Sequence, residues 1–125
     1  MRHFKTIVFV FAVLLYADMA TDAFANKAAI TIEAPASAAP GTEITVKVTV
    51  THNANNMFHH VNWVYIMVNG KETGRWEFGW MTLPEGVSFS RELRYKVTGL
   101  LEIKAEANCN LHGSKGPATK TISVR

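Results

Sequence analysis

The sequence predicts an all-β fold, an immunoglobulin-like β-sandwich of about seven short strands. Apolar and polar residues alternate with a period of two along several segments, as in strands that bury one face. Turn residues separate these segments, and no stretch shows the 3.6-residue period of an amphipathic helix. Seven short strands in a domain of about 100 residues are typical of this sandwich class.

The start of the chain resembles a secretory signal peptide. Residues 1–5 are basic, residues 6–16 are apolar, and Ala23-Phe24-Ala25 supplies the small-x-small pattern that precedes cleavage. The apolar run is well short of the roughly 20 residues that span a bilayer. We therefore expect a signal peptide over residues 1–25, one domain over residues 26–125, a periplasmic location, and no membrane attachment after cleavage.

The first half of the expected domain contains three strands. Ala28–Glu33 is short and β-like, and a loop rich in proline and small residues follows it at 34–41. Glu43–Val50 has a clean two-residue alternation. Trp63–Val68 is a more continuous apolar run, which suits a central strand, and the Asn69-Gly70 pair after it is a strong hairpin signal.

The second half continues the strand pattern. The four expected strands are Lys71–Trp80, Val87–Val97, Leu101–Ala107 and Ala118–Val124. Pro84-Glu85-Gly86 separates the first two as a turn, and Gly99 ends the next. The domain is therefore predicted to be a run of strands with no helix.

Composition excludes some function classes. Cleavage would remove Arg2 and Lys5 from 13 basic residues and Asp18 and Asp22 from 10 acidic ones, so the net charge stays at +3. The basic residues form no run, which argues against nucleic acid as a partner. A single cysteine has no partner for an intramolecular disulfide, although secretion favours disulfides.

Every histidine of the expected domain, and its one cysteine, falls in two short segments. The first holds His52, His59 and His60, and the second holds Cys109 and His112. Each segment lies at the end of an expected strand, where a rigid sandwich can hold a site. Imidazole suits iron, copper and zinc, and a thiolate favours the softer of these metals. The clustering therefore predicts a mixed nitrogen and sulfur metal site.

These segments carry a family resemblance. Cys109-Asn110-Leu111-His112-Gly113 resembles the Cys-Asn-x-His-Gly turn of superoxide reductases, the family of neelaredoxin and the iron domain of desulfoferrodoxin. The stretch from His59 to Trp63 resembles the family's His-aromatic-Ile-x-Trp segment. The resemblance implies a mononuclear, non-haem iron held by histidines and an axial cysteine. Carried over residue by residue, it assigns His52, His59, Cys109 and His112 as metal ligands.

The chain departs from the family at one ligand. The family's Glu-Lys-His-Val-Pro segment supplies a fourth histidine and a lysine that attracts superoxide, and residues 30–35 contain neither residue type. His60 and Glu33 are the candidates for a further ligand. Adjacent residues of an extended segment point to opposite faces, which favours His59 over His60. Lys115 is the lysine near the site in sequence that could replace the missing cation.

The resemblance implies an oxidoreductase that reduces superoxide to hydrogen peroxide, with electrons from an unidentified periplasmic donor. Two alternatives remain. A cupredoxin-like copper protein would also use histidine and cysteine on a sandwich, but no methionine follows Cys109 as an axial ligand. A non-catalytic immunoglobulin-like partner-binding module, such as a sulfur-oxidation carrier partner, would leave the His/Cys clustering unexplained. Iron is the expected metal, with copper and zinc as alternatives, and homo-oligomerisation stays open.

Overall fold

A computed structural model describes residues 26–125, and the predicted signal peptide lies outside these described residues. The prediction of an all-β, immunoglobulin-like sandwich is confirmed. The described chain has eight strands: β1 Ala29–Glu33, β2 Ser37–Ala38, β3 Glu43–Thr51, β4 Val61–Val68, β5 Lys71–Glu77, β6 Ser88–Lys96, β7 Leu101–Cys109 and β8 Ala118–Val124. No helix among residues 26–125 is long and apolar enough to cross a membrane.

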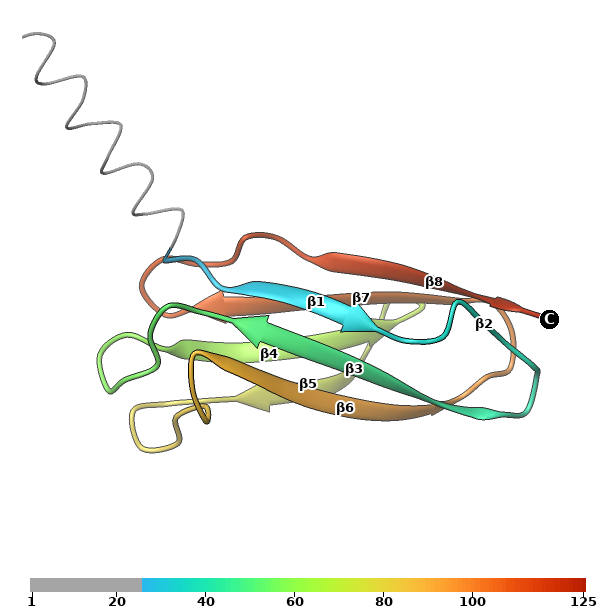
Figure 1. Cartoon of the computed structure of the whole chain (residues 1–125), viewed down its shortest axis with the longest axis horizontal. Coiled ribbons are helices and arrows are strands. Elements are labelled where there is room, and N and C mark those ends of the chain that lie inside the picture. The colour runs from blue at the N-terminus through green and yellow to red at the C-terminus, as the bar shows by residue number, and fades with distance from the viewer. Residues whose placement is uncertain (1–25) are drawn as a thin grey trace, which may run out of the picture.

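The strands form two sheets that face each other (Figure 1). One sheet has the order β1-β3-β6, and the other has the order β2-β8-β7-β4-β5. All neighbours pair antiparallel except the short β2, which pairs parallel with β8. Its two residues lie in the expected proline-rich loop, which is why alternation did not reveal it.

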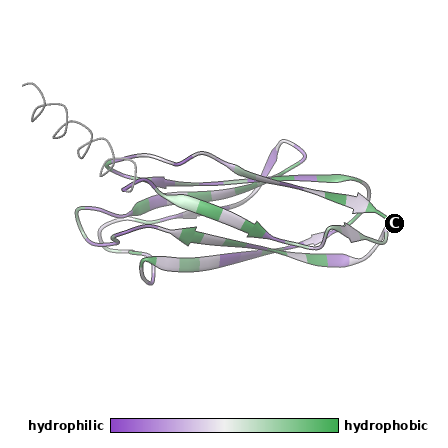
Figure 2. Cartoon of the chain, turned by 45° about the horizontal axis from the view of Figure 1, so that its top comes forward, coloured by the Kyte–Doolittle hydropathy of each residue, from purple (hydrophilic) through white to green (hydrophobic). Residues whose placement is uncertain are grey.

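The core lies between the sheets and follows from the alternation. Val46, Val48 and Val50 of β3 face Val64 and Ile66 of β4, and all five are fully buried. Figure 2 shows the matching bands of apolar and polar residues along the strands. Burying one branched side chain contributes about 1.5–3 kcal/mol, so these faces hold the two sheets together.

Four chain segments meet at one end of the sandwich. The register places Ala29 of β1 and Ser88 of β6 opposite Thr51, the last residue of β3. It also places Val61, the first residue of β4, opposite Cys109, the last residue of β7. In Figure 1 the β3–β4, β5–β6 and β7–β8 connections therefore lie together at the left, with the start of β1. Both histidine-bearing segments are at this end.

Three local predictions can be compared with the structure. Asn69 and Gly70 have φ values of 51° and 79°, which is the left-handed geometry that the hairpin prediction requires. The strand expected over 71–80 ends at Glu77, and Trp80 is exposed. The strand expected over 101–107 extends to Cys109, so the cysteine ends β7 and does not lie in the following turn.

Candidate metal centre

The structure brings the four matched residues together. His52 directly follows β3, and His59 lies two residues before β4. Cys109 ends β7, and His112 lies in the turn after it. Because β4 and β7 are paired neighbours, the loop before β4 and the turn after β7 meet at the same edge.

The donor atoms of these residues converge. Ligand atoms of His52, His59 and Cys109 all lie within 4.8 Å of one another. Nδ1 of His112 is 3.2 Å from Nε2 of His59 and 3.8 Å from the Cys109 sulfur. The rings of His52 and His59, and those of His59 and His112, meet edge to face, with centroids 4.7 Å and 4.9 Å apart. One ion can be shared by such a group.

Burial of the donor residues favours metal binding. Cys109 is 1% exposed and His52 is 2% exposed. The pKa of His59 is lowered, first by burial and then by repulsion from His52 and His112. A lowered pKa favours the neutral imidazole of His59, which is the form that binds a metal. His59 and His112 are only half-buried, so the group is open to solvent on one side.

An asparagine shapes the loop that presents His59. Oδ1 of Asn56 accepts hydrogen bonds from the backbone N–H groups of Phe58 and His59, at 3.0 and 2.9 Å. The backbone N–H of Asn56 donates to the His59 carbonyl at 2.8 Å. This turn closes on itself without a strand, because an asparagine side chain can mimic a backbone acceptor.

Asn110 fastens the loop to the turn that carries Cys109 and His112. Its backbone N–H donates to the His60 carbonyl, and its Oδ1 accepts from the His60 N–H, both at 3.0 Å. Its Nδ2 donates to the Phe58 carbonyl at 3.1 Å. Asn110 therefore sets the separation of His59 from Cys109 and His112.

The Cys109 turn is closed by backbone bonds. Cys109 N–H donates to the Gly113 carbonyl at 2.9 Å, and Gly113 N–H donates to the Cys109 carbonyl at 3.0 Å. Gly113 has a φ of 81°, where a side chain is strained, so glycine is required at this position. The turn places His112 back over the sulfur.

One further observation indicates that this group of residues suits a metal ion. Nδ1 of His52 is buried and has no hydrogen-bond partner among the described residues. A buried polar atom without a partner costs roughly 1–3 kcal/mol, and a bound cation would remove that cost. Imidazole nitrogens with one thiolate are a donor set for iron, copper or zinc.

The two further candidate ligands lie differently. Nδ1 of His60 is 3.0 Å from the Asn56 carbonyl, which only accepts, so that nitrogen is a donor. His60 is not among the residues whose ligand atoms lie within 4.8 Å of one another. Glu33 ends β1 beside Lys47, whereas Ala29 at the other end of that strand lies near His52. Four strand residues span about 13 Å, so Glu33 is not brought to the group.

Asn26 reaches the site, with Lys27 next to it in the chain, and sequence reasoning missed both. The Asn26 carbonyl is 2.8 Å from Nε2 of His52. Lys27 follows it, and the Lys115 backbone N–H donates to the Ala28 carbonyl at 2.9 Å, so both lysines are at this end. Contacts of a backbone carbonyl leave no residue pattern. The one available signal was their place directly after the expected cleavage site.

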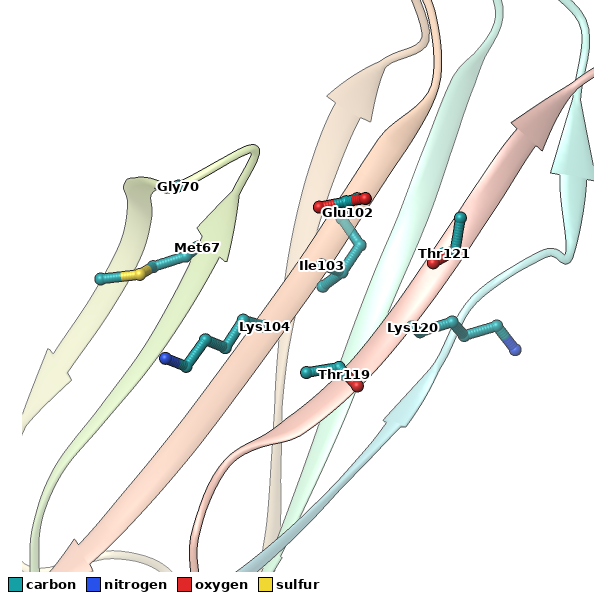
Figure 3. Close-up of a pocket in the computed structure, with 8 residues that line it drawn as sticks. All are labelled: Met67, Gly70, Glu102, Ile103, Lys104, Thr119, Lys120 and Thr121. Carbon is teal, nitrogen blue, oxygen red and sulfur yellow. The ribbon is translucent and has the colours of Figure 1, made fainter.

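A hollow in the surface lies away from this group. It has a volume of about 380 Å³ on the outer face of the five-stranded sheet. Its lining residues, shown in Figure 3, are Met67, Gly70, Glu102, Ile103, Lys104, Thr119, Lys120 and Thr121. Its lining has neither histidine nor cysteine, and we assign it no part in metal binding.

Comparison with known proteins agrees with the geometry. The family model described as Desulfoferrodoxin matches residues 20–114. A superoxide reductase (neelaredoxin) from Ignicoccus hospitalis is 25% identical with a TM-score of 0.62, covering 79% of this chain and 82% of that chain. No curated protein gives a significant match.

More distant structures share the fold alone. A putative superoxide reductase from Thermotoga maritima is 22% identical, with a TM-score of 0.59 over 78% of this chain and 86% of that chain. The sulfur carrier protein SoxY from Chlorobium limicola f thiosulfatophilum is 15% identical, with a TM-score of 0.58 over 77% and 78%. Since SoxY has this fold too, the sandwich alone does not distinguish superoxide reductases from sulfur carrier proteins. The convergent donor atoms are the feature that bears on this choice.

Proposed function

This chain belongs to the desulfoferrodoxin family, and on that premise we propose that it is a periplasmic superoxide reductase-like protein. It holds one mononuclear non-haem iron through His52, His59, Cys109 and His112. It reduces superoxide to hydrogen peroxide and is recharged by an external one-electron donor. The observation that carries the proposal is the convergence of the His52, His59 and Cys109 donor atoms within 4.8 Å, with His112 beside them.

The residues divide the chemistry among them. When bound, ferrous iron supplies the one electron that reduces superoxide, and solvent supplies two protons. A bound metal would hold Cys109 as a thiolate, and the sulfur would donate electron density to it. The three histidines would fix the ion at the sandwich end, and the lowered pKa of His59 favours its neutral, metal-binding form.

Access to the group is open on the side of the loops. His59 and His112 are half-buried, so a small anion reaches them without a channel. Several large apolar side chains are exposed in the connections at this end: Met57, Phe58, Trp80, Met81, Leu83, Val87 and Leu111. The proposed site therefore lies within reach of solvent, as fast release of peroxide requires.

Product stoichiometry tests the proposed reaction. Chain loaded with ferrous iron should bind about one iron and form one hydrogen peroxide for each superoxide consumed, with an electron donor present. Dismutation would instead form one peroxide for two superoxides, together with dioxygen. Stopped-flow mixing with peroxide and oxygen detection separates these results. A chain that binds no iron, or that binds it and leaves superoxide unchanged, would contradict the proposal.

Optical spectra separate the copper alternative. A ferric–thiolate centre gives a band in the red, a copper–thiolate centre gives an intense blue colour, and a module without metal gives neither. After loading with iron and copper in competition, followed by oxidation of the bound metal, we expect the ferric–thiolate spectrum. An intense blue form with copper held in preference would instead favour the cupredoxin-like function.

Ionic strength is expected to affect the superoxide reaction only weakly. The net charge of +3 is spread along the chain, and no lysine occupies the family's lysine-bearing position. A focused positive field raises encounter rates roughly 10- to 1,000-fold and is screened by salt, so most of this gain should be missing. Pulse radiolysis at low and high salt measures the effect.

The matched variants are Lys115→Ala at the site end and Lys120→Ala on β8, beside the surface hollow (Figure 3). Lys115→Ala should remove what salt dependence exists, and Lys120→Ala should leave it unchanged. A near-diffusion-limited rate that falls steeply with salt in both variants would contradict the prediction. Lys27 would then be the cation to substitute.

A further inference from the structure

Three turns at the metal end present large apolar side chains to solvent. Each turn is closed by backbone hydrogen bonds between its first and last residues: Asn56 with His59 at 2.8 Å, Gly79 with Thr82 at 3.3 and 3.1 Å, and Cys109 with Gly113 at 2.9 and 3.0 Å. The side chains between these closing pairs are Met57, Phe58, Trp80, Met81 and Leu111, and they are 51–78% exposed. These turns, residues 56–59, 79–82 and 109–113, form the apolar tips of the domain.

Folding gives no reason for these residue types. Glycine, proline, asparagine, aspartate and serine predominate in turns because they suit the geometry, yet Trp80 and Met81 fill both central positions of the second turn. Of the nine large apolar side chains exposed among residues 26–125, seven lie in the connections at this end, and only Leu100 and Val124 lie at the other. Exposed apolar groups gathered in one place mark an interaction surface.

Hydrogen bonds join the three connections that carry the tips. Nδ2 of Asn55 donates to the Gly86 carbonyl at 2.6 Å, which ties the β3–β4 connection to the β5–β6 connection. Nδ2 of Asn110 donates to the Phe58 carbonyl at 3.1 Å, which ties the β3–β4 connection to the turn after β7. The tips therefore belong to one end of the sandwich, seen at the left in Figure 1.

The tips border the open side of the proposed metal centre. Phe58 and Leu111 directly precede His59 and His112, the two half-buried histidines of the convergent group. A protein that contacts Phe58 and Leu111 is therefore beside the ligands through which an electron would enter.

The tips are uncharged. None of the three turns contains aspartate, glutamate, lysine or arginine. The carboxylates on either side of the second turn are each paired with an arginine, Glu77 with Arg75 at 3.0 Å and Glu85 with Arg91 at 2.7 Å. Lys115 lies two residues beyond the third turn. The surface that complements these tips is therefore uncharged and apolar, with charges at most around its rim.

We propose that the apolar tips are the docking surface for the electron donor, a small electron-transfer protein whose own redox group lies beneath an uncharged, apolar face. The inference rests on the proposed function, which requires such a donor. One electron passes from the reduced donor to the ferric ion at the site. The donor is oxidised by one electron, and no bond is made or broken.

The occupant of the tips has to leave again. Superoxide reaches the proposed site through the same open side, so a second copy or a membrane surface held there permanently would block it. Weak electron-transfer complexes bury less than about 1,200 Å² in total, an area that a few turns can supply. Met57 and Met81 add flexible side chains that adapt to a partner during brief contacts. These features favour a transient protein partner.

The test compares the unsubstituted protein with two tip variants and one matched control. Phe58→Ser and Trp80→Ser each remove an apolar side chain from a different tip. Leu100→Ser removes one that is 55% exposed at the opposite end of the sandwich. Because all three side chains are exposed, the variants should stay folded, which thermal unfolding checks.

Two reduced electron carriers serve as probes, both selected for a reduction potential below that of the ferric centre. One is a blue-copper protein selected for an uncharged, apolar face over its copper, and the other is a c-type cytochrome selected for lysines around its haem edge. Backbone amide NMR of the metal-free protein, titrated with each carrier, locates the contact and gives its Kd. Stopped-flow mixing with the ferric-loaded protein gives the rate of electron transfer. Dithionite is the small reductant that needs no docking surface.

We expect the copper carrier to shift the amide signals of the apolar tips, with little dependence on salt because the contact is uncharged. Phe58→Ser and Trp80→Ser should each weaken its binding and slow its electron transfer about tenfold, as truncation of a central interface residue does. Leu100→Ser should change neither quantity. The cytochrome should bind more weakly than the copper carrier, and dithionite should reduce the iron of all four proteins at the same rate.

The outcomes distinguish this inference from the proposed function. Absence of copper-carrier binding, binding elsewhere on the domain, or unchanged binding in both tip variants overturns the inference, even when the iron-loaded protein reduces superoxide. Dimerisation, or sedimentation with phosphatidylcholine vesicles, that Trp80→Ser abolishes also overturns it, because a second copy or a membrane then covers the tips. A protein that takes up no iron but binds the copper carrier at the tips overturns the proposed function and leaves the docking surface supported.

Discussion

Cys109→Ser should abolish the thiolate-to-metal absorption band of the iron-loaded protein. The sulfur is the one thiol of the chain, and its ligand atom lies within 4.8 Å of those of His52 and His59. A buried hydroxyl neither becomes an anion as readily nor donates electron density as strongly. Iron affinity should also fall. Loss of a group that only orients a ligand lowers metal affinity about 10- to 100-fold, and loss of the ligand itself should lower it further. Optical titration with iron measures both changes.

The control for this substitution concerns folding. Cys109 is 1% exposed, so an added hydroxyl can destabilise the domain by itself. Cys109→Ala avoids the buried hydroxyl and should lose the same band. Thermal unfolding of both metal-free variants shows how much of the loss is structural. A red or blue band that survives in either variant would remove Cys109 from the ligand set.

His59→Ala should lose metal, whereas His60→Ala should keep it. The two residues are neighbours, yet the structure uses them differently. Nε2 of His59 lies 3.2 Å from Nδ1 of His112, and the His59 ring contacts the His52 ring edge to face. His60 is 6% exposed and turns its Nδ1 to the Asn56 carbonyl. Metal content per folded chain, measured after dialysis against a weak chelator, compares them.

The second variant has its own expected effect. Removing the His60 ring loses one buried hydrogen bond, which costs about 0.5–1.5 kcal/mol of unfolding free energy. His60→Gln keeps a donor for Asn56 and should recover part of that loss. Metal retained by His59→Ala and lost by His60→Ala would show that the ligand register is one residue off.

Strand positions were predictable where one face of the strand is buried. Ala118–Val124 is predicted with its observed bounds, and Glu43–Val50 differs from β3 by one residue. In such strands every second side chain must be apolar, and the sequence shows it. Trp80 was placed in a strand because it continued an aromatic alternation. The alternation does not show that pairing stops at Glu77, which lies opposite Trp63 near the start of the partner strand β4.

A metal site at the two histidine-bearing segments was predictable from residue type and spacing, and the resemblance to superoxide reductases selected His52, His59, Cys109 and His112. Histidine and cysteine are scarce in this chain, so their clustering is informative. Asn26 was not predictable because its role depends on a backbone oxygen that every residue has. Glu33 was considered because a carboxylate can bind iron, but the strand pairing holds it at the far end of β1.

The pairing of β4 with β7 also sets when the centre can form. His59 and His112 are 53 residues apart, so their approach closes a long loop whose entropy is recovered only after distant strands pair. The proposed ligands are therefore expected to assemble late in folding, and an ion that arrives earlier would find no complete set. Metal binding to the folded chain would then shift the folding equilibrium toward the folded state. A free metal concentration of about 100 times the Kd adds about 2.7 kcal/mol to the unfolding free energy.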